Sequence, residues 1–142
     1  MSVFSSNAMT VMRDIAEASA TPEQCKSNIL DRLEGHETEV FHSQVLVAQY
    51  IPPSRTKGGI ILTDNRVKEE RHQGTIFLVI GMGPAAFKDD NIAQFHGKEL
   101  YVGDWVMAVA GDGIAMDIRG MPCRLYQDTR ILMRVTDPSI YY

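Results

Sequence analysis

The chain has 142 residues and a net charge of −4, from 14 lysines and arginines against 18 aspartates and glutamates. Its hydrophobic fraction of 44% is too high, and its net charge too low, for a disordered chain. It lacks the basic balance typical of nucleic-acid binding. The longest nearly continuous apolar run, residues 76–82, is too short to span a membrane, so one globular domain is expected.

The N-terminus and the cysteines predict a cytoplasmic protein. The N-terminus lacks the basic and then apolar plan of a signal peptide, and Asp14 and Glu17 are untypical of an organelle presequence. Cys25 and Cys123 lie far apart in the sequence and near no pair of histidines. Two free thiols in a reducing compartment are therefore expected, rather than a disulfide framework or a zinc site.

The first forty residues predict two short amphipathic helices. Residues 5–19 carry apolar side chains at helical spacing, at Ala8, Val11, Met12 and Ile15. The second helix has Thr21 as its N-cap and Pro22 at its first position. Its apolar stripe precedes a stop at Gly35 and consists of Cys25, Ile29, Leu30 and Leu33. Each helix has one apolar face, which must pack either on its own chain or on a neighbour.

From residue 40 the pattern becomes that of β-strands, which are predicted at residues 41–50, 75–80, 105–110, 114–118, 121–126 and 131–135. In the first strand one face carries Val45, Val47 and Gln49, and the other carries Leu46 and Ala48. Turns are expected at residues 111–113 and 119–120, where glycines lie. Short strands at this regular spacing predict a small antiparallel β-barrel.

Two longer segments interrupt the strands, at residues 52–73 and 84–98. The first is polar and charged, but it contains the apolar triplet Ile60, Ile61 and Leu62 directly after Gly58 and Gly59. One interpretation is a short hairpin strand of residues 60–63, buried in the barrel. The breakers before it and the charged residues after it instead favour a docking peptide, which orders in the apolar groove of a partner.

No group of residues has the spacing of a catalytic or metal site. Residues 81–86 match the dinucleotide fingerprint G-x-G-x-x-A, but that motif requires a helix after it within a βαβ unit, and a loop is expected there. Two of Asp104, Asp112 and Asp117 lie in glycine-flanked turns. The histidines lie in four unrelated segments, at His36, His42, His72 and His96. We therefore expect no catalytic residue, no metal and no cofactor.

From Gln44 to Val135 the chain resembles the co-chaperonin family, the GroES-like lids of double-ring chaperonins. The tripeptide Val45-Leu46-Val47 is similar to the first strand of the family. Residues 54–63 resemble its mobile loop, with the Gly-Gly-Ile-x-Leu core at residues 58–62 as the most specific part. Residues 101–106, Tyr-Val-Gly-Asp-Trp-Val, resemble its Val-Gly-Asp-x-Val turn. The three motifs occur in order and at compatible spacing.

The resemblance implies a mainly β fold, a small GroES-like barrel at residues 40–137 with a mobile loop at about 52–73 and a roof segment at about 81–100. It implies a ring of identical subunits, seven in number, that caps a GroEL-like chaperonin and assists ATP-dependent folding without being an enzyme; the chaperonin binds the ATP. The implied chaperonin-binding residues are Gly58, Gly59, Ile60, Ile61 and Leu62. The implied subunit interface contains Val45, Val47, Leu132 and Val135.

The family has no counterpart for residues 1–39, which we interpret as a helical N-terminal extension, while residues 138–142 form a C-terminal tail. An extended lid of this kind is similar to phage-encoded co-chaperonins, so the expected compartment is the cytoplasm of a bacterium or of the phage's host. The alternative is a structural ring or adaptor, for example of a virus particle. In that case residues 1–39 would dock a neighbouring protein and the loop would be a fixed interface.

Overall fold

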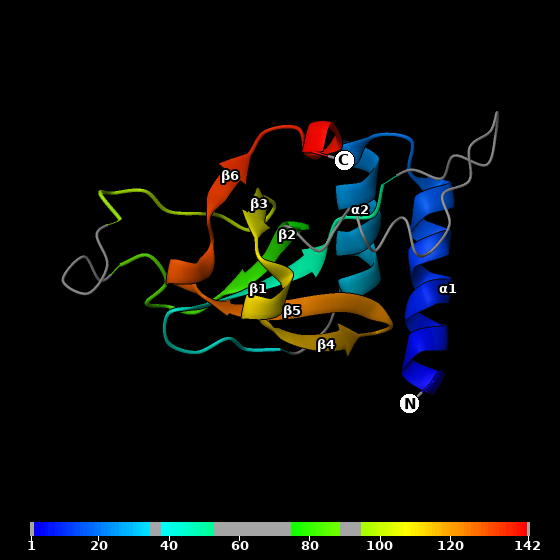
Figure 1. Ribbon diagram of the computed structural model, residues 1–142, viewed down its shortest axis with the longest axis horizontal. Coiled ribbons are helices and arrows are strands. Elements are labelled where there is room, and N and C mark those ends of the chain that lie inside the picture. Colours follow the sequence, from blue (N-terminus) through cyan, green and yellow to red (C-terminus); the bar gives the residue numbers. More distant parts are fainter. Residues whose placement is uncertain (1, 35–37, 53–74, 89–94, 142) are drawn as a thin grey trace.

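The computed structural model describes residues 2–34, 38–52, 75–88 and 95–141 (Figure 1). Two helices come first, α1 (Ser2–Ala18) and α2 (Pro22–Leu33). The strands of the described part are β1 (Gln44–Gln49), β2 (Thr75–Met82), β3 (Trp105–Ala108), β4 (Ile114–Ile118), β5 (Met121–Gln127) and β6 (Met133–Val135). Short 3₁₀ turns are η1 (Ala110–Asp112), η2 (Asp128–Arg130) and η3 (Pro138–Tyr141). The predicted fold class, mainly β with an N-terminal pair of helices, is confirmed.

Helix α2 begins where its capping residues predict. The side chain of Thr21 accepts a hydrogen bond from the Gln24 amide at 3.2 Å, and Pro22 occupies the first turn, where no amide donor is needed. At the other end Arg119 donates to the carbonyl oxygen of Glu34 at 2.9 Å. This bond satisfies a backbone group that has no partner within the helix. None of the described helices is long and apolar enough to cross a bilayer.

The strands form one antiparallel sheet in the order β4-β5-β1-β2-β3-β6. Strand β1 therefore lies in the middle, paired with β5 on one side and with β2 on the other. Four consecutive residues of β1, Val45 to Ala48, are buried. Because successive side chains point to opposite faces, both faces of the sheet are covered at this strand.

The two helices cover one of these faces. In Figure 1 they lie side by side next to the sheet, and both contact β5. Their apolar stripes join Leu46, Ala48 and Met121 in one cluster, and the helical members of that cluster are Val11, Ile15, Cys25, Ile29 and Leu33. The apolar faces of the extension thus pack on the chain's own sheet, which decides between the two possibilities that the sequence left open.

The other face carries a second cluster, made by Val45, Val47, Phe77 and Tyr126 together with two residues from the connection between β2 and β3, Ala86 and Leu100. The Tyr126 hydroxyl donates to the carbonyl oxygen of Val109 at 2.9 Å. Burial raises the pKa of Tyr126 to about 12. A Cβ atom at Gly113 would lie 2.8 Å from the Tyr126 ring, so this packing requires glycine there.

Several element ends differ from the prediction for local reasons. Strand β2 continues to Met82 rather than ending before Gly81, because Gly81 and Met82 still pair with β1 beyond an irregularity at Leu46/Val47. Strand β1 starts at Gln44 rather than at residue 41, since His42 has a positive φ of 60°. Strands β3 and β6 are shorter than predicted where the 3₁₀ turns η1 and η2 adjoin them. The predicted turn at residues 119–120 is confirmed, with φ values of 52° and 80°.

Helix α2 provides a direct test of this packing. Ile29 has 0% of its side chain exposed, so Ile29→Ala should lower the free energy of unfolding by about 2–5 kcal/mol through lost burial and a residual cavity. Asp31→Ala, on the exposed side of the same helix, should change it by less than about 0.5 kcal/mol. Urea unfolding at one protein concentration measures both. Equal effects would contradict the packing of α2 on the sheet.

The two thiols provide a second test. Burial raises the pKa of Cys25 to about 11 and that of Cys123 to about 12, so at pH 8 almost no thiolate forms at either. Ellman's reagent should therefore label neither thiol in the folded protein during the time in which urea-unfolded chains react completely. Rapid labelling of one thiol at pH 8 would contradict its burial, whereas faster labelling as the pH approaches 11 is expected.

Candidate functional site

The predicted chaperonin-binding residues, Gly58, Gly59, Ile60, Ile61 and Leu62, lie outside the described residues. The structure does describe the two points between which they are inserted. The chain leaves the sheet after Tyr50 and Ile51, and it returns at the start of β2. These points are adjacent, because Gln49 pairs with Phe77 and the Tyr50 amide donates to the carbonyl oxygen of Ile76 at 2.9 Å.

The residues predicted at a subunit interface have two different environments. Val45 and Val47 have 0% exposure on the central strand, and Val135 has 4%. The side chains of all three residues therefore belong to the interior of their own chain. Leu132 differs, since 61% of it is exposed. Of the four residues predicted at the subunit interface, Leu132 is therefore the one exposed on the described surface, and the interface itself stays a prediction.

Leu132 stands next to an open sheet edge. Strand β6 pairs with β3 on one side and, among the described strands, has no neighbour on the other. Met133, beside Leu132, is 40% exposed, and the Leu132 amide donates to the carbonyl oxygen of Met107 at 2.9 Å. A cleft runs along this edge between β6, η2 and the connection from β2 to β3. An exposed apolar edge of this kind is a surface on which another chain can pair.

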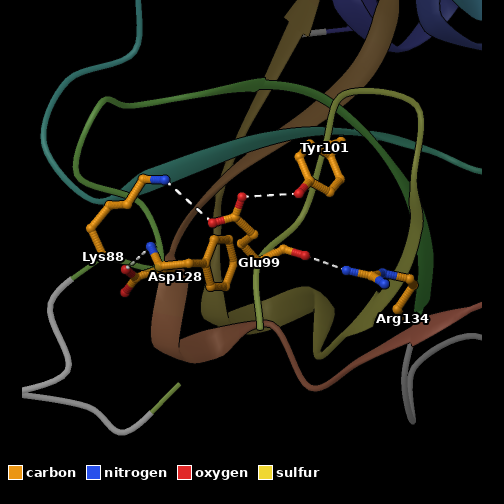
Figure 2. A network of polar contacts seen from close by, with 6 residues as sticks. Lys88, Glu99, Tyr101, Asp128 and Arg134 are labelled. Atoms are coloured by element: carbon orange, nitrogen blue, oxygen red, sulfur yellow. Dashed lines mark hydrogen bonds and ion pairs between the residues drawn. The ribbon is translucent and has the colours of Figure 1, made fainter. Parts of the chain in front are cut away.

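A polar network connects the described residues on the two sides of residues 89–94, which we call the base of the predicted roof segment (Figure 2). The Glu99 carboxylate lies at its centre, 3.3 Å from the Lys88 ammonium, and it accepts a hydrogen bond from the Tyr101 hydroxyl at 3.0 Å. Lys88 and Glu99 stand on the two sides of residues 89–94. The network therefore joins the two described parts of the roof segment.

The same network reaches the edge strand. Arg134 of β6 donates a hydrogen bond to the backbone carbonyl oxygen of Glu99, and its Nε atom lies 3.5 Å from the Asp104 carboxylate. Asp104 also accepts a hydrogen bond from the Tyr101 amide at 2.9 Å, while Gly103 adopts a φ of +101°. The Val-Gly-Asp motif is therefore a turn that its own aspartate closes, and the same aspartate faces β6.

Charge and hydrogen bonding set the ionisation of this network. The hydrogen bond from the Tyr101 hydroxyl, followed by the hydrogen bond and charge of Lys88, holds the pKa of the Glu99 carboxyl below its usual range. The same contact with Glu99 raises the pKa of Tyr101. Because folding lowers the pKa of Glu99, these contacts stabilise the folded state fully at a pH above the ordinary pKa of a glutamate. This stabilisation is lost as the pH falls through the lowered pKa.

A second, more buried contact lies beside this network. Asp128, in η2, is only 6% exposed, and its carboxylate accepts a hydrogen bond from the Phe87 amide at 3.0 Å. Phe87 has a positive φ of 61°, which is unusual for a bulky residue, and its ring packs edge-on against Phe95 at 5.3 Å. Asp128 therefore stabilises a strained backbone position at the start of the roof segment.

Neither Glu99 nor Asp128 was singled out from the sequence. Lys88 lies 11 residues from Glu99 and Phe87 lies 41 residues from Asp128, so no local spacing connects these two pairs, although Tyr101 is only two residues from Glu99. Only the Val-Gly-Asp motif gave a signal, because an aspartate after glycine is typical of a turn that its side chain closes.

The glycines of the dinucleotide-like motif serve the packing of the fold. Gly81 lies within β2, and a turn at residues 84–88 follows instead of a helix. A Cβ atom at Gly83 would lie 2.2 Å from the carbonyl oxygen of His42, so close packing accounts for that glycine. Within the described ranges no group of histidine, cysteine or carboxylate side chains could hold a metal ion. His36 and His72 lie outside those ranges.

Comparison with known proteins identifies the family. No curated protein sequence matches the chain significantly. The family model of the chaperonin 10 kDa subunit, however, matches residues 37–135, which is more than half of the chain. The match includes all six described strands and the roof segment, and it begins after α2. The chain therefore belongs to the chaperonin 10 kDa subunit family, the GroES-like co-chaperonins that assemble as rings and work with GroEL-like chaperonins.

Proposed function

We propose that this chain forms a ring of seven subunits that caps a double-ring, GroEL-like chaperonin and assists the ATP-dependent folding of client chains. The observation that carries the proposal is the motif Gly58-Gly59-Ile60-Ile61-Leu62, which lies within the family match. The triplet would bind an apolar groove of the chaperonin, and the two glycines would let the backbone turn into it. ATP would be bound by the chaperonin, and this chain would act in the cytoplasm without a cofactor or catalysis.

The energy of one such contact explains why the lid should be a ring. Burying the side chains of Ile60, Ile61 and Leu62 contributes roughly 5–9 kcal/mol. Fixing the backbone costs about 1–2 kcal/mol per residue, so ordering the five residues of the motif offsets most of this gain. A single copy of the motif should bind weakly. Several copies on one ring bind together through their effective concentration, and they release together when the grooves change shape.

The geometry of the described residues supports this proposal in two ways. The chain leaves and re-enters the sheet at adjacent points, Tyr50 and Ile76, so the two ends of the segment between them lie next to each other. The exposed Leu132 and the open edge of β6 offer a surface for a subunit contact. We accordingly place the contact between ring subunits at this edge.

The first experiment is size-exclusion co-elution with a double-ring bacterial chaperonin, with and without ATP. We expect the wild-type protein to co-elute in a nucleotide-dependent way, and we expect Ile61→Asp to abolish this, because a carboxylate cannot be buried in an apolar groove without a large desolvation cost. Ile140→Asp is the matched control, since Ile140 is 69% exposed in the C-terminal turn η3, outside the family match. That variant should co-elute as the wild type does.

The results of this experiment separate the proposed function from its alternative. If Ile61→Asp co-elutes like the wild type, the triplet does not carry the contact. If the wild type forms a stable ring that never co-elutes with the chaperonin, the protein is better explained as a structural ring or adaptor, and α1 and α2 become the surface to investigate.

The roof segment can be tested without a chaperonin. Asp128→Ala removes the acceptor of the Phe87 amide, and an unpaired, partly buried donor costs about 1–3 kcal/mol. We therefore expect a lower free energy of unfolding and faster hydrogen exchange of the Phe87 amide. Asp128→Asn keeps an acceptor and should lower the free energy of unfolding by less. Asp112→Ala, at an exposed turn, should change the free energy of unfolding little. Equal losses for the alanine variants at positions 128 and 112 would show that Asp128 does not hold the roof base.

A further inference from the structure

Helix α2 touches the point at which the chain leaves the sheet towards the predicted chaperonin-binding residues. The Cys25 thiol donates a hydrogen bond to the backbone carbonyl oxygen of Ile51, with Sγ and O 3.4 Å apart. Cys25 is 1% exposed and Ile51 is 3% exposed. Both belong to the core cluster between the helices and the sheet. This contact therefore joins the helical extension to the last part of the chain before residues 53–74.

Two other contacts hold the same point from the side of the sheet. The Tyr50 amide donates to the carbonyl oxygen of Ile76, at the start of β2. The Tyr50 ring packs edge-on against Trp105 of β3, with ring centroids 5.1 Å apart and planes inclined by 81°. The backbone at Tyr50 and Ile51 is thus fixed by β2, by β3 and by α2. Only the contact from α2 comes from outside the family match, which begins at residue 37.

From this arrangement we infer that α2 is a positioning element of this co-chaperonin, in which Cys25 acts through Ile51 to fix where and in which direction the chain leaves the sheet. The inference rests on the proposed function in one respect, namely that residues 58–62 bind the chaperonin. We call the backbone at Tyr50 and Ile51 the root of the segment that carries residues 58–62. If the root is fixed, a binding segment attached to it can reach only a smaller volume, which raises its effective concentration at the partner's grooves. Loosening the root should therefore weaken binding without changing the residues that make the contact.

Cys123 supplies a matched control. It is 2% exposed in the same core cluster, and its thiol donates to the carbonyl oxygen of Met121, two residues away in its own strand. Cys25→Ala and Cys123→Ala thus remove the same atom from the same cluster. A purely structural role predicts similar effects of both variants on every measurement. A positioning role predicts that only Cys25→Ala changes the behaviour of the root.

The first readout needs no chaperonin. In the free, full-length protein we measure the hydrogen exchange of the Tyr50 amide, which the bond to Ile76 protects. Cys25→Ala should raise its exchange rate by about fivefold or more, because local opening of the root becomes easier, whereas Cys123→Ala should leave the rate within about twofold of the wild type. Urea unfolding of both variants shows whether their global stabilities are matched.

The second readout is the affinity for a double-ring chaperonin in the presence of ATP. We expect Cys25→Ala to weaken binding by about threefold to tenfold, since each subunit of the ring carries the same small loss, and we expect Cys123→Ala to bind as the wild type does. Unchanged exchange of the Tyr50 amide in Cys25→Ala, or the same increase in both variants, overturns the inference. Faster exchange with unchanged affinity overturns the positioning role.

A failure of the proposed function would look different. In that case the wild type itself does not bind the chaperonin, and the exchange measurement still decides whether α2 holds the root of the segment.

Discussion

The central strand β1 is buried on both faces, and the rest of the architecture follows from this constraint. A sheet that exposes apolar side chains on two sides needs a cover on each. On one side the cover is the helical pair, whose stripes pack on Leu46 and Ala48. On the other side it is the base of the roof segment, which places Ala86 and Leu100 over Val45 and Val47. Both the added helices and the roof base are therefore parts of the core.

Local signals in the sequence predicted most of the elements. The cap at Thr21, the proline after it and the stripe at Cys25 and Ile29 defined α2, and alternating apolar residues between glycine turns defined the strands. The ends of the strands were predicted less accurately, because a strand end depends on pairing with distant residues, as at Met82. The burial of Val45 and Val47 within the chain was not predicted, because alternation along one strand does not reveal that both faces of the sheet are covered.

The polar contacts could not be predicted, for a different physical reason. The bonds from Lys88 to Glu99 and from Phe87 to Asp128 join segments that only the tertiary fold brings together. The bond from Cys25 to Ile51 spans 26 residues and joins a helix to a strand end. A cysteine in an apolar stripe usually behaves as a small, buried hydrophobic residue. Nothing in its spacing identifies the carbonyl group to which its thiol donates. The proposed chaperonin-binding motif at residues 58–62, by contrast, rests on the sequence, because it lies outside the described residues.

The contact of both helices with β5 affects how the protein folds while it is synthesised on the ribosome. The helices are synthesised well before the strand on which they pack, Met121–Gln127. Until that strand emerges, their apolar stripes have no complete surface to cover. Contacts between such distant parts of a chain form slowly. The core between the helices and the sheet can therefore be completed only when β5 has been synthesised, so this member of a family of folding assistants completes its own core late in its synthesis.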